Sequence, residues 1–267
     1  MAELGKYSDA IRDMTWSYSR INSFDDCQYR WLLHYIIYPD YPGIENFFAS
    51  YGTFMHELLA DFYRGEKSAF ELQVEYLTQF RERVTGRAPN QKVFDNYFSD
   101  GLQYLKTLKP SENKVLAVEQ KFEIDFFMHP GKLIGYIDLI EQMPDGSIII
   151  TDHKSRDLKP RSKREKPTKT DEELDLYLRQ LYIYSAYIGQ TFMQMPALLC
   201  INSFRKGVMI QEPFNMKAFA QAKSWGSAEQ KRIENETDFR PDIEYFKCNY
   251  LCDMREVCEY YQIAKGT

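Results

Sequence analysis

Residues 132–155, KLIGYIDLIEQMPDGSIIITDHKS, decide the fold of this chain. Apolar residues dominate two segments, 132–143 and 147–155, as expected of strands that are buried in a sheet. Between them stands PDG at 144–146, which is a sequence typical of a tight turn. The stretch therefore predicts two antiparallel strands joined as a hairpin.

Two carboxylates and a lysine fall on this hairpin. With the turn centred near residue 145, Asp138 lies about opposite Asp152, and side chains at paired positions point to the same face. Lys154 follows two residues later and projects to that face, whereas the ring of His153 faces away and leaves only its backbone carbonyl as a ligand. Carboxylate oxygens suit Mg²⁺ or Mn²⁺, and a lysine can position or deprotonate a water molecule. The pattern predicts a hydrolytic metal site; an exposed strand face is the alternative for Asp138.

The elements around the hairpin indicate an α/β protein with a helical N-terminal region. Segment 115–127 alternates with a period of two and predicts a third strand, which makes a three-stranded antiparallel meander. Helical spacing of apolar residues is found at 16–38, 50–64 and 68–109. We expect Ser19 or Ser23 to cap the first of these helices. Gly86 and Pro89 mark a break within the last segment. After the hairpin we expect a mobile loop at 156–169, a helix to about Gly189, a strand at 196–204 with its hairpin partner, and a helix at 215–235. A βββαβ core wrapped by helices results.

Three regions are expected within one compact unit. They are a helical region at 1–110, the core at 111–235 and a cysteine-bearing tail at 236–267. The apolar runs are too short to span a bilayer, and the charged N-terminus MAELGKYSDAIRD is unlike a signal peptide, so we expect a cytoplasmic protein without a membrane partner. The net charge of −5 excludes a surface that is basic throughout, but it still allows a local basic groove for nucleic acid.

The hairpin also carries a family resemblance. GYIDLI followed by IIITDHKS resembles the core of RecB-like PD-(D/E)xK nucleases, which implies a restriction-endonuclease-like fold with a mixed sheet and flanking helices. The resemblance extends to a histidine on an N-terminal helix, an acidic residue in the preceding strand and a helical Q-x-x-x-Y pattern. By this resemblance His56, four residues after Gly52, is a metal ligand together with Asp138, Asp152 and the His153 carbonyl. It likewise implies that Glu119, with Glu123 as the fallback, supports the site, and that Gln180 and Tyr184 orient it and steady the substrate.

The cysteines give a further point of resemblance. One subgroup of the family holds an iron–sulfur cluster between a single early cysteine and a C-terminal cysteine group, here Cys27 with Cys248, Cys252 and Cys258. The family spacing in the tail is C-x2-C-x5-C, and this chain has C-x3-C-x5-C, one residue longer in the first gap. A [4Fe-4S] cluster is therefore implied, and zinc bound by the same four thiolates is the alternative. The fifth, Cys200, stands in an apolar strand and is interpreted as a small core residue.

A basic segment follows the expected site. RDLKPRSKREKPTK at 156–169 holds seven basic and two acidic residues, so it can grip phosphates beside the metal, or else it is a solvated linker. The candidate DNA-binding residues in it are Lys159, Arg161, Lys163 and Arg164.

The resemblance implies a Mg²⁺- or Mn²⁺-dependent deoxyribonuclease. We expect it to act as an exonuclease on single strands or DNA ends, in recombination, repair or the processing of phage or mobile-element DNA. Because the chain lacks the G-x-x-x-x-G-K-[ST] loop of a motor, any helicase or recombination partner would be a separate protein. Two alternatives are a non-catalytic nucleic-acid-binding protein that keeps the fold and an electron-transfer protein built on the cysteines.

Overall fold

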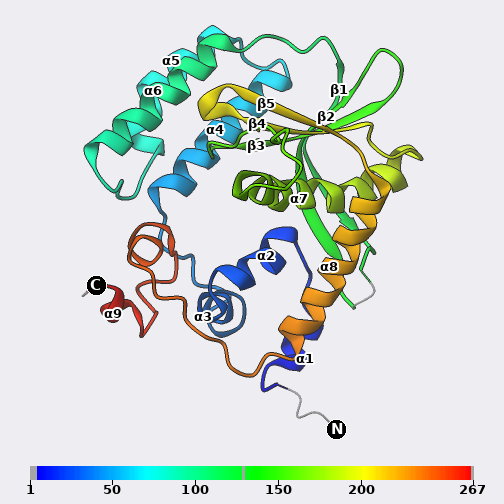
Figure 1. Ribbon diagram of the computed structural model, residues 1–267. Helices are drawn as coiled ribbons and strands as arrows, with labels where there is room; N and C mark the ends of the chain where they lie inside the picture. Colours follow the sequence, from blue (N-terminus) through cyan, green and yellow to red (C-terminus); the bar gives the residue numbers. More distant parts are fainter. Residues whose placement is uncertain (1–4, 128–129, 266–267) are drawn as a thin grey trace.

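The computed structural model describes residues 5–127 and 130–265 (Figure 1). The first four residues of the charged N-terminal segment lie outside this range. Within it no helix is long and apolar enough to cross a membrane. The helices that precede the sheet are α1 (Ser8–Arg12), α2 (Tyr18–Asp26), α3 (Gln28–Leu32), η1 (Leu33–Ile37), α4 (Phe47–Tyr63), α5 (Ala69–Arg83) and α6 (Gln91–Thr107). The remaining elements are β1 (Lys114–Ile124), β2 (Leu133–Gln142), β3 (Ile148–Lys154), α7 (Lys169–Phe192), β4 (Leu198–Ser203), η2 (Phe204–Lys206), β5 (Val208–Pro213), α8 (Met216–Glu234), η3 (Lys247–Leu251) and α9 (Tyr261–Lys265).

The sheet has five strands in the order β1-β2-β3-β4-β5. The first three form an antiparallel meander, β4 joins β3 in parallel after the crossover helix α7, and β5 returns antiparallel to β4. This confirms the expected meander and the mixed sheet of an α/β protein. In β2 and β3, Leu139 pairs with Thr151, which is the register that sets Asp138 opposite Asp152.

Helices cover both faces of the sheet (Figure 1). On one side, Leu174, Leu178 and Leu181 of α7 pack into the largest apolar core with the sheet, next to α8. On the other side, α4 contacts β1 and β2, and it forms a second, aromatic core with α5 and α6. Burial of these apolar faces is the main force that fixes the layers. The candidate site lies where α4, the meander and α7 meet.

The prediction of one continuous helix at 16–38 is wrong. This segment is divided at Cys27, whose extended backbone (φ −169°, ψ 108°) separates α2 from α3. Ser17, rather than Ser19 or Ser23, caps α2 by accepting a hydrogen bond from the Arg20 backbone N–H. The Cys27 sulfur caps α3 in the same way, at 3.4 Å from the Arg30 nitrogen. A side chain that can accept such a bond lets the helix restart after a corner.

The other helix boundaries agree more closely with the sequence. The break expected near Gly86 and Pro89 separates α5 from α6. Helix α7 starts with a capping box, in which Thr168 and Asp171 each accept a bond from the backbone N–H of the other. Segment 156–168 has no regular structure but is anchored, because Leu158 is buried and its N–H donates to Ser203 Oγ.

The C-terminal tail returns to the N-terminal helices. The Arg30 guanidinium lies 2.6 Å from an Asp253 carboxylate oxygen, and Tyr29 donates to Glu259 at 2.7 Å. The Asn46 amide donates to the Leu251 carbonyl at 3.2 Å. These contacts place all four expected cluster cysteines in the same part of the molecule.

Candidate active site

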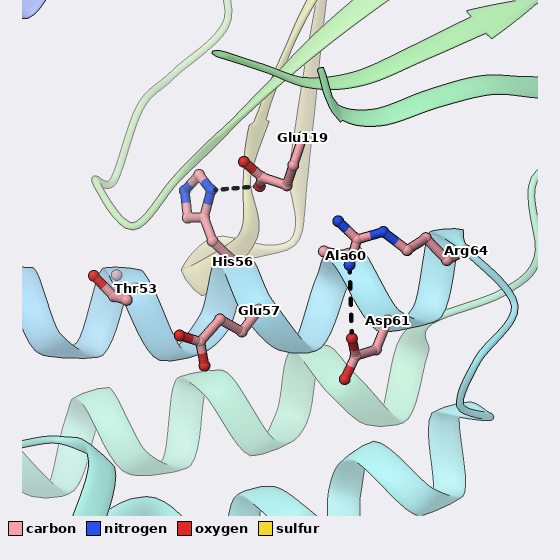
Figure 2. Close-up of a pocket in the computed structure, with 8 residues that line it drawn as sticks. Thr53, His56, Glu57, Ala60, Asp61, Arg64 and Glu119 are labelled. Carbon is pink, nitrogen blue, oxygen red and sulfur yellow. Dashed lines mark ion pairs between the residues drawn. The ribbon is translucent and has the colours of Figure 1, made fainter. Parts of the chain in front are cut away.

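Three elements bring metal-binding side chains together. His56 comes from α4, Glu119 from β1 and Asp138 from β2, and one ligand atom of each lies within 4.8 Å of the others. The His56 Nδ1 atom is 3.6 Å from both Glu119 Oε1 and Asp138 Oδ2, and Figure 2 shows His56 and Glu119 facing each other. Imidazole nitrogen and carboxylate oxygens form a donor set that Mg²⁺ or Mn²⁺ can use. The fallback residue Glu123 is exposed, further along β1.

Glu119 has an unusual backbone. Its φ of +51° is in the left-handed region, which a non-glycine residue adopts at a cost of roughly 1–2 kcal/mol. The pairs on either side, Val118 with Leu139 and Gln120 with Ile137, keep their register around it. The left-handed turn therefore re-aims one side chain without shifting the strand. Such local strain is typical of functional sites.

A second group of polar residues adjoins the first. The Gln180 amide bridges Asp152 and Lys154: its Nε2 donates to Asp152 Oδ1 at 3.2 Å, and its Oε1 accepts from Lys154 Nζ at 3.2 Å. The other oxygen, Asp152 Oδ2, is buried and lies 2.9 Å from Lys154 Nζ as an ion pair, but within the described residues it receives no well-directed hydrogen bond. A buried carboxylate oxygen without a donor is costly. It fits a residue that shares a cation, so the donor set here fits the implied metal.

The His153 peptide connects the two groups. Its N–H donates to Asp138 Oδ2 at 2.6 Å, and its carbonyl accepts from His56 Nε2 at 2.9 Å. The ring points to the other face, as expected, where it stacks on Tyr63 at 5.7 Å between ring centroids. The Asn202 amide donates to His153 Nδ1 at 3.0 Å and to the Tyr104 hydroxyl at 2.6 Å. Burial holds the pKa of the His153 ring well below its ordinary value, so the ring is neutral.

The Asn202 amide gives a first prediction. Asn202→Ala removes the donor that fixes the His153 ring, and thereby loosens the peptide that holds Asp138 and His56. We expect the Mn²⁺ concentration for half-maximal cleavage to rise about 10-fold, as for other groups that orient ligands. Tyr104→Phe, which loses only the outer hydrogen bond, should produce a smaller shift. Equal metal dependence in Asn202→Ala and the unchanged protein would show that the network does not act on the site.

Burial and charge shift the pKa of Asp138. Desolvation, followed by repulsion from Asp152, raises this pKa to about 7, and attraction by His56 only partly opposes the rise. Without metal, the folded protein therefore keeps a proton on Asp138 up to neutral pH, whereas the unfolded chain loses it near pH 4. The stability that this proton contributes is fully present below about pH 4 and is lost as pH rises to about 7.

This loss of stability between about pH 4 and pH 7 gives a second prediction. Asp138→Asn removes the charge that is costly to bury, so the metal-free variant should melt at a higher temperature than the unchanged protein at pH 8. The difference should shrink toward pH 4, where both side chains are neutral. Thermal unfolding across this pH range, with divalent metal omitted, makes the measurement. A variant that is less stable at pH 8 would contradict the burial argument, and cleavage by the variant should be lost.

The pKa values of His56 and Lys154 are both raised. Burial lowers the pKa of His56, but the contacts with Glu119 and Asp138 outweigh it and raise the pKa overall. Burial also opposes the charge on Lys154, and the Asp152 carboxylate outweighs it, so this pKa is raised. Lys154 is therefore a positively charged ammonium in the metal-free protein, and it can stabilise negative charge on a phosphate group.

The remaining expected residues lie in different surroundings. Tyr184 is only 5% exposed and packs edge-on against Phe122, so it lies beneath the site and away from solvent. Arg161 is held by Asp175 at 2.6 Å and Glu212 at 3.1 Å. The other basic candidates, Lys159, Lys163 and Arg164, are exposed.

Four cysteines line one small cavity, formed by Cys27, Cys248, Cys252 and Cys258. Burial raises the pKa of the Cys252 thiol to about 11. The residue that exceeds the family spacing falls in η3, a π-helical turn in which the Cys252 N–H donates to the Lys247 carbonyl. Such a turn absorbs one extra residue, so the longer spacing still delivers both cysteines to the cavity. Cys200 is buried in β4 as expected of a core residue.

The family comparison agrees with the fold and the site. The family model described as the PD-(D/E)XK nuclease superfamily matches residues 15–259. The chain therefore belongs to this superfamily, as the hairpin sequence predicts.

Two known proteins are similar over part or most of the chain. One is a subunit of the ATP-dependent helicase/deoxyribonuclease of Streptococcus uberis, 25% identical over 166 residues, which are 56% of this chain but only 14% of the relative. This similarity supports the RecB-like branch, although the chain spans about a seventh of that relative's length. The other is a crystal structure described as a candidate exonuclease from Eubacterium rectale, with a TM-score of 0.51 and 12% identity over 94% of this chain and 91% of that one. At this identity the match concerns the fold alone.

Proposed function

We propose that the protein is a Mg²⁺- or Mn²⁺-dependent deoxyribonuclease that acts as an exonuclease on single strands or DNA ends. One observation carries the proposal: the His56, Glu119 and Asp138 group is joined through the His153 peptide to the Asp152, Lys154 and Gln180 group. Family membership supports nuclease chemistry. The DNA substrate is supported by the name of the helicase/deoxyribonuclease relative, and the exonuclease mode is part of the proposal that the assay below tests.

Each of these residues would have a distinct role in phosphodiester hydrolysis. A divalent cation held by His56, Glu119, Asp138 and Asp152 would lower the pKa of a water molecule and offset charge on the phosphate. Lys154 places its ammonium beside the same carboxylate and can stabilise the charge that develops on the phosphate oxygens. Gln180 holds Lys154 and Asp152 in a fixed relation through its two amide atoms. The buried Tyr184 supports Gln180 from below.

A direct assay tests this proposal. Purified protein is incubated with labelled linear single-stranded, circular single-stranded and duplex DNA, with Mg²⁺, with Mn²⁺ or with neither. We expect metal-dependent loss of linear strands while circles persist, because an exonuclease needs an end. Cleavage of circles would replace the exonuclease mode with an endonuclease. Absence of cleavage on every substrate would favour the alternative, a nucleic-acid-binding protein that retains the fold.

The four cysteines are proposed to hold a [4Fe-4S] cluster. The four cysteines line one cavity, as the resemblance implies for a cluster site, and zinc bound by the same four thiolates is the alternative. The Cys27 sulfur accepts N–H bonds from Arg30 at 3.4 Å and Asp242 at 3.3 Å, as cluster-bound sulfurs do. Metal analysis of protein purified without oxygen distinguishes iron from zinc.

A separate helicase or recombination protein is the proposed partner. The Streptococcus uberis relative is named as a subunit of a helicase/deoxyribonuclease, which supports a helicase partner. A role in recombination, repair or mobile-element DNA, in the cytoplasm, belongs to the same proposal.

A further inference from the structure

A cleft of about 540 Å³ runs along α4 on both sides of His56. Its lining comes from α4 and from Glu119 (Figure 2). Gly52, His56, Ala60 and Arg64 follow at intervals of four residues, so they form one row along the helix. At about 1.5 Å per residue, this row covers about 18 Å, with the candidate metal ligand inside it. The cleft is therefore longer than the metal site itself.

The space above Gly52 is empty of protein. A Cβ atom added at Gly52 would meet nothing within 4 Å among the described residues, so no packing contact requires glycine there. A glycine inside a helix costs roughly 1 kcal/mol relative to alanine. By contrast, a Cβ at Gly101 of α6 would collide with the hydroxyls of Tyr76 and Tyr51, which explains that glycine by packing. A ligand that passes close to α4 at this point would account for a glycine that packing does not require.

Arg64, at the other end of the row, has only a long ion pair with the described part of the protein. Asp61 is held by Lys67 at 2.9 Å, whereas Arg64 reaches it only at 3.9 Å. The Arg64 guanidinium makes no hydrogen bond within the described residues. Figure 2 shows this group lying back over Ala60, on the side of His56. Since Glu57 is paired with Arg83, both acidic residues of α4 along the cleft are neutralised and a polyanion can enter.

We infer that this cleft binds one DNA strand next to the scissile phosphate, with its backbone close to Gly52 and a phosphate on Arg64. This inference rests on the proposed nuclease function and adds the substrate path and two residues. A cavity of about 540 Å³ is the size of a small-ligand pocket, so it receives a segment of one strand rather than a duplex. Guanidinium groups bind phosphate oxygens through paired N–H donors.

Binding of a fluorescent single-stranded oligonucleotide tests the Arg64 contact. Anisotropy is measured in EDTA across a salt series, so the result does not depend on cleavage. Arg64→Ala should weaken binding about five-fold and reduce the slope of log Kd against log salt by about 0.7, the value for one phosphate contact. Arg64→Lys should recover much of the loss, and Lys217→Ala on α8 should bind like the unchanged protein. An unchanged slope in Arg64→Ala would overturn the contact.

Gly52 gives a test with an opposite effect on stability. Gly52→Ala should raise Tm by about 1–3 °C, because alanine favours the helix, yet weaken oligonucleotide binding. Gly52→Val should weaken binding further, since more of the cleft is filled. Gly189→Ala, in α7 beside the end of Met195, is the helix-glycine control and should bind normally. Normal oligonucleotide binding by Gly52→Val would overturn the inference. If the unchanged protein cleaved no DNA in the presence of metal, only the proposed nuclease function would be refuted.

Discussion

Lys154→Ala should reduce DNA cleavage by a factor of about 10³ while DNA binding falls only slightly. The ammonium lies 2.9 Å from Asp152 and 3.2 Å from the Gln180 amide oxygen, so it is fixed where a phosphate must approach the carboxylates. Removal of one pre-oriented group that stabilises developing charge typically lowers kcat by about 10² to 10³, and loss of a proton donor or acceptor adds to this. Single-turnover cleavage of a labelled linear strand and oligonucleotide anisotropy supply the two measurements.

Two further variants make this result specific. Lys159→Ala removes a nearby exposed charge from the basic segment, and it should change salt dependence more than kcat. Lys154→Arg keeps the charge but changes its shape and reach, so we expect only partial recovery. Full turnover by Lys154→Ala would show that the active-site assignment is wrong. Equal losses of cleavage and binding would instead assign Lys154 to substrate affinity.

Cys27→Ser should lower Tm by about 10 °C and remove most of the bound metal. A ligand group bound only by the folded state stabilises it by about 4 kcal/mol when present at about 1,000 times its dissociation constant, and about 2–4 °C follows from each kcal/mol in a protein of this size. Cys27 is the only member of the four that lies outside the tail. Its loss therefore removes the only ligand by which the proposed cluster would join the N-terminal part to the tail.

The control for this variant is Cys200→Ala. It removes a buried sulfur from β4 and should lower Tm through a small cavity, with unchanged metal content. Scanning calorimetry and metal analysis are made on the same samples. If Cys27→Ser kept its metal and its Tm, the cysteines would not form a shared site. The contacts of Arg30 with Asp253 and of Tyr29 with Glu259 should preserve part of the tail attachment in Cys27→Ser.

The meander was predictable because its determinants are local. The turn at 144–146 and the apolar runs on both sides fix the register of β2 against β3, and with it the approach of Asp138 to Asp152. The helical N-terminal region was predictable for the same reason. The corner at Cys27 was not, because the chain on both sides has helical spacing and only the sulfur cap and the tail contacts reveal the break.

Features of the site that depend on distant pairing could not be predicted. The compact group of His56 and Asp138 also contains Glu119, which we expected only to support the site, and the left-handed backbone at Glu119 accompanies the approach of its carboxylate to His56. Asn202 was missed because its partner, His153, becomes its neighbour only through the parallel pairing of β3 with β4. A polar residue inside the apolar run of β4 was the available signal.

The cysteine cavity also has a consequence for the timing of folding during synthesis. Cys248 is made 221 residues after Cys27, which at about 5–20 residues per second corresponds to roughly 10–45 seconds. Throughout that interval the corner between α2 and α3 lacks its tail, whereas α4 and the meander, which carry the candidate metal ligands, are completed before the tail is made. A nascent chain can therefore form the sheet before it can close this corner. With the proposed cluster, exposure to oxygen or a shortage of iron in that window would leave a folded core whose two ends are joined only by contacts such as Arg30 with Asp253.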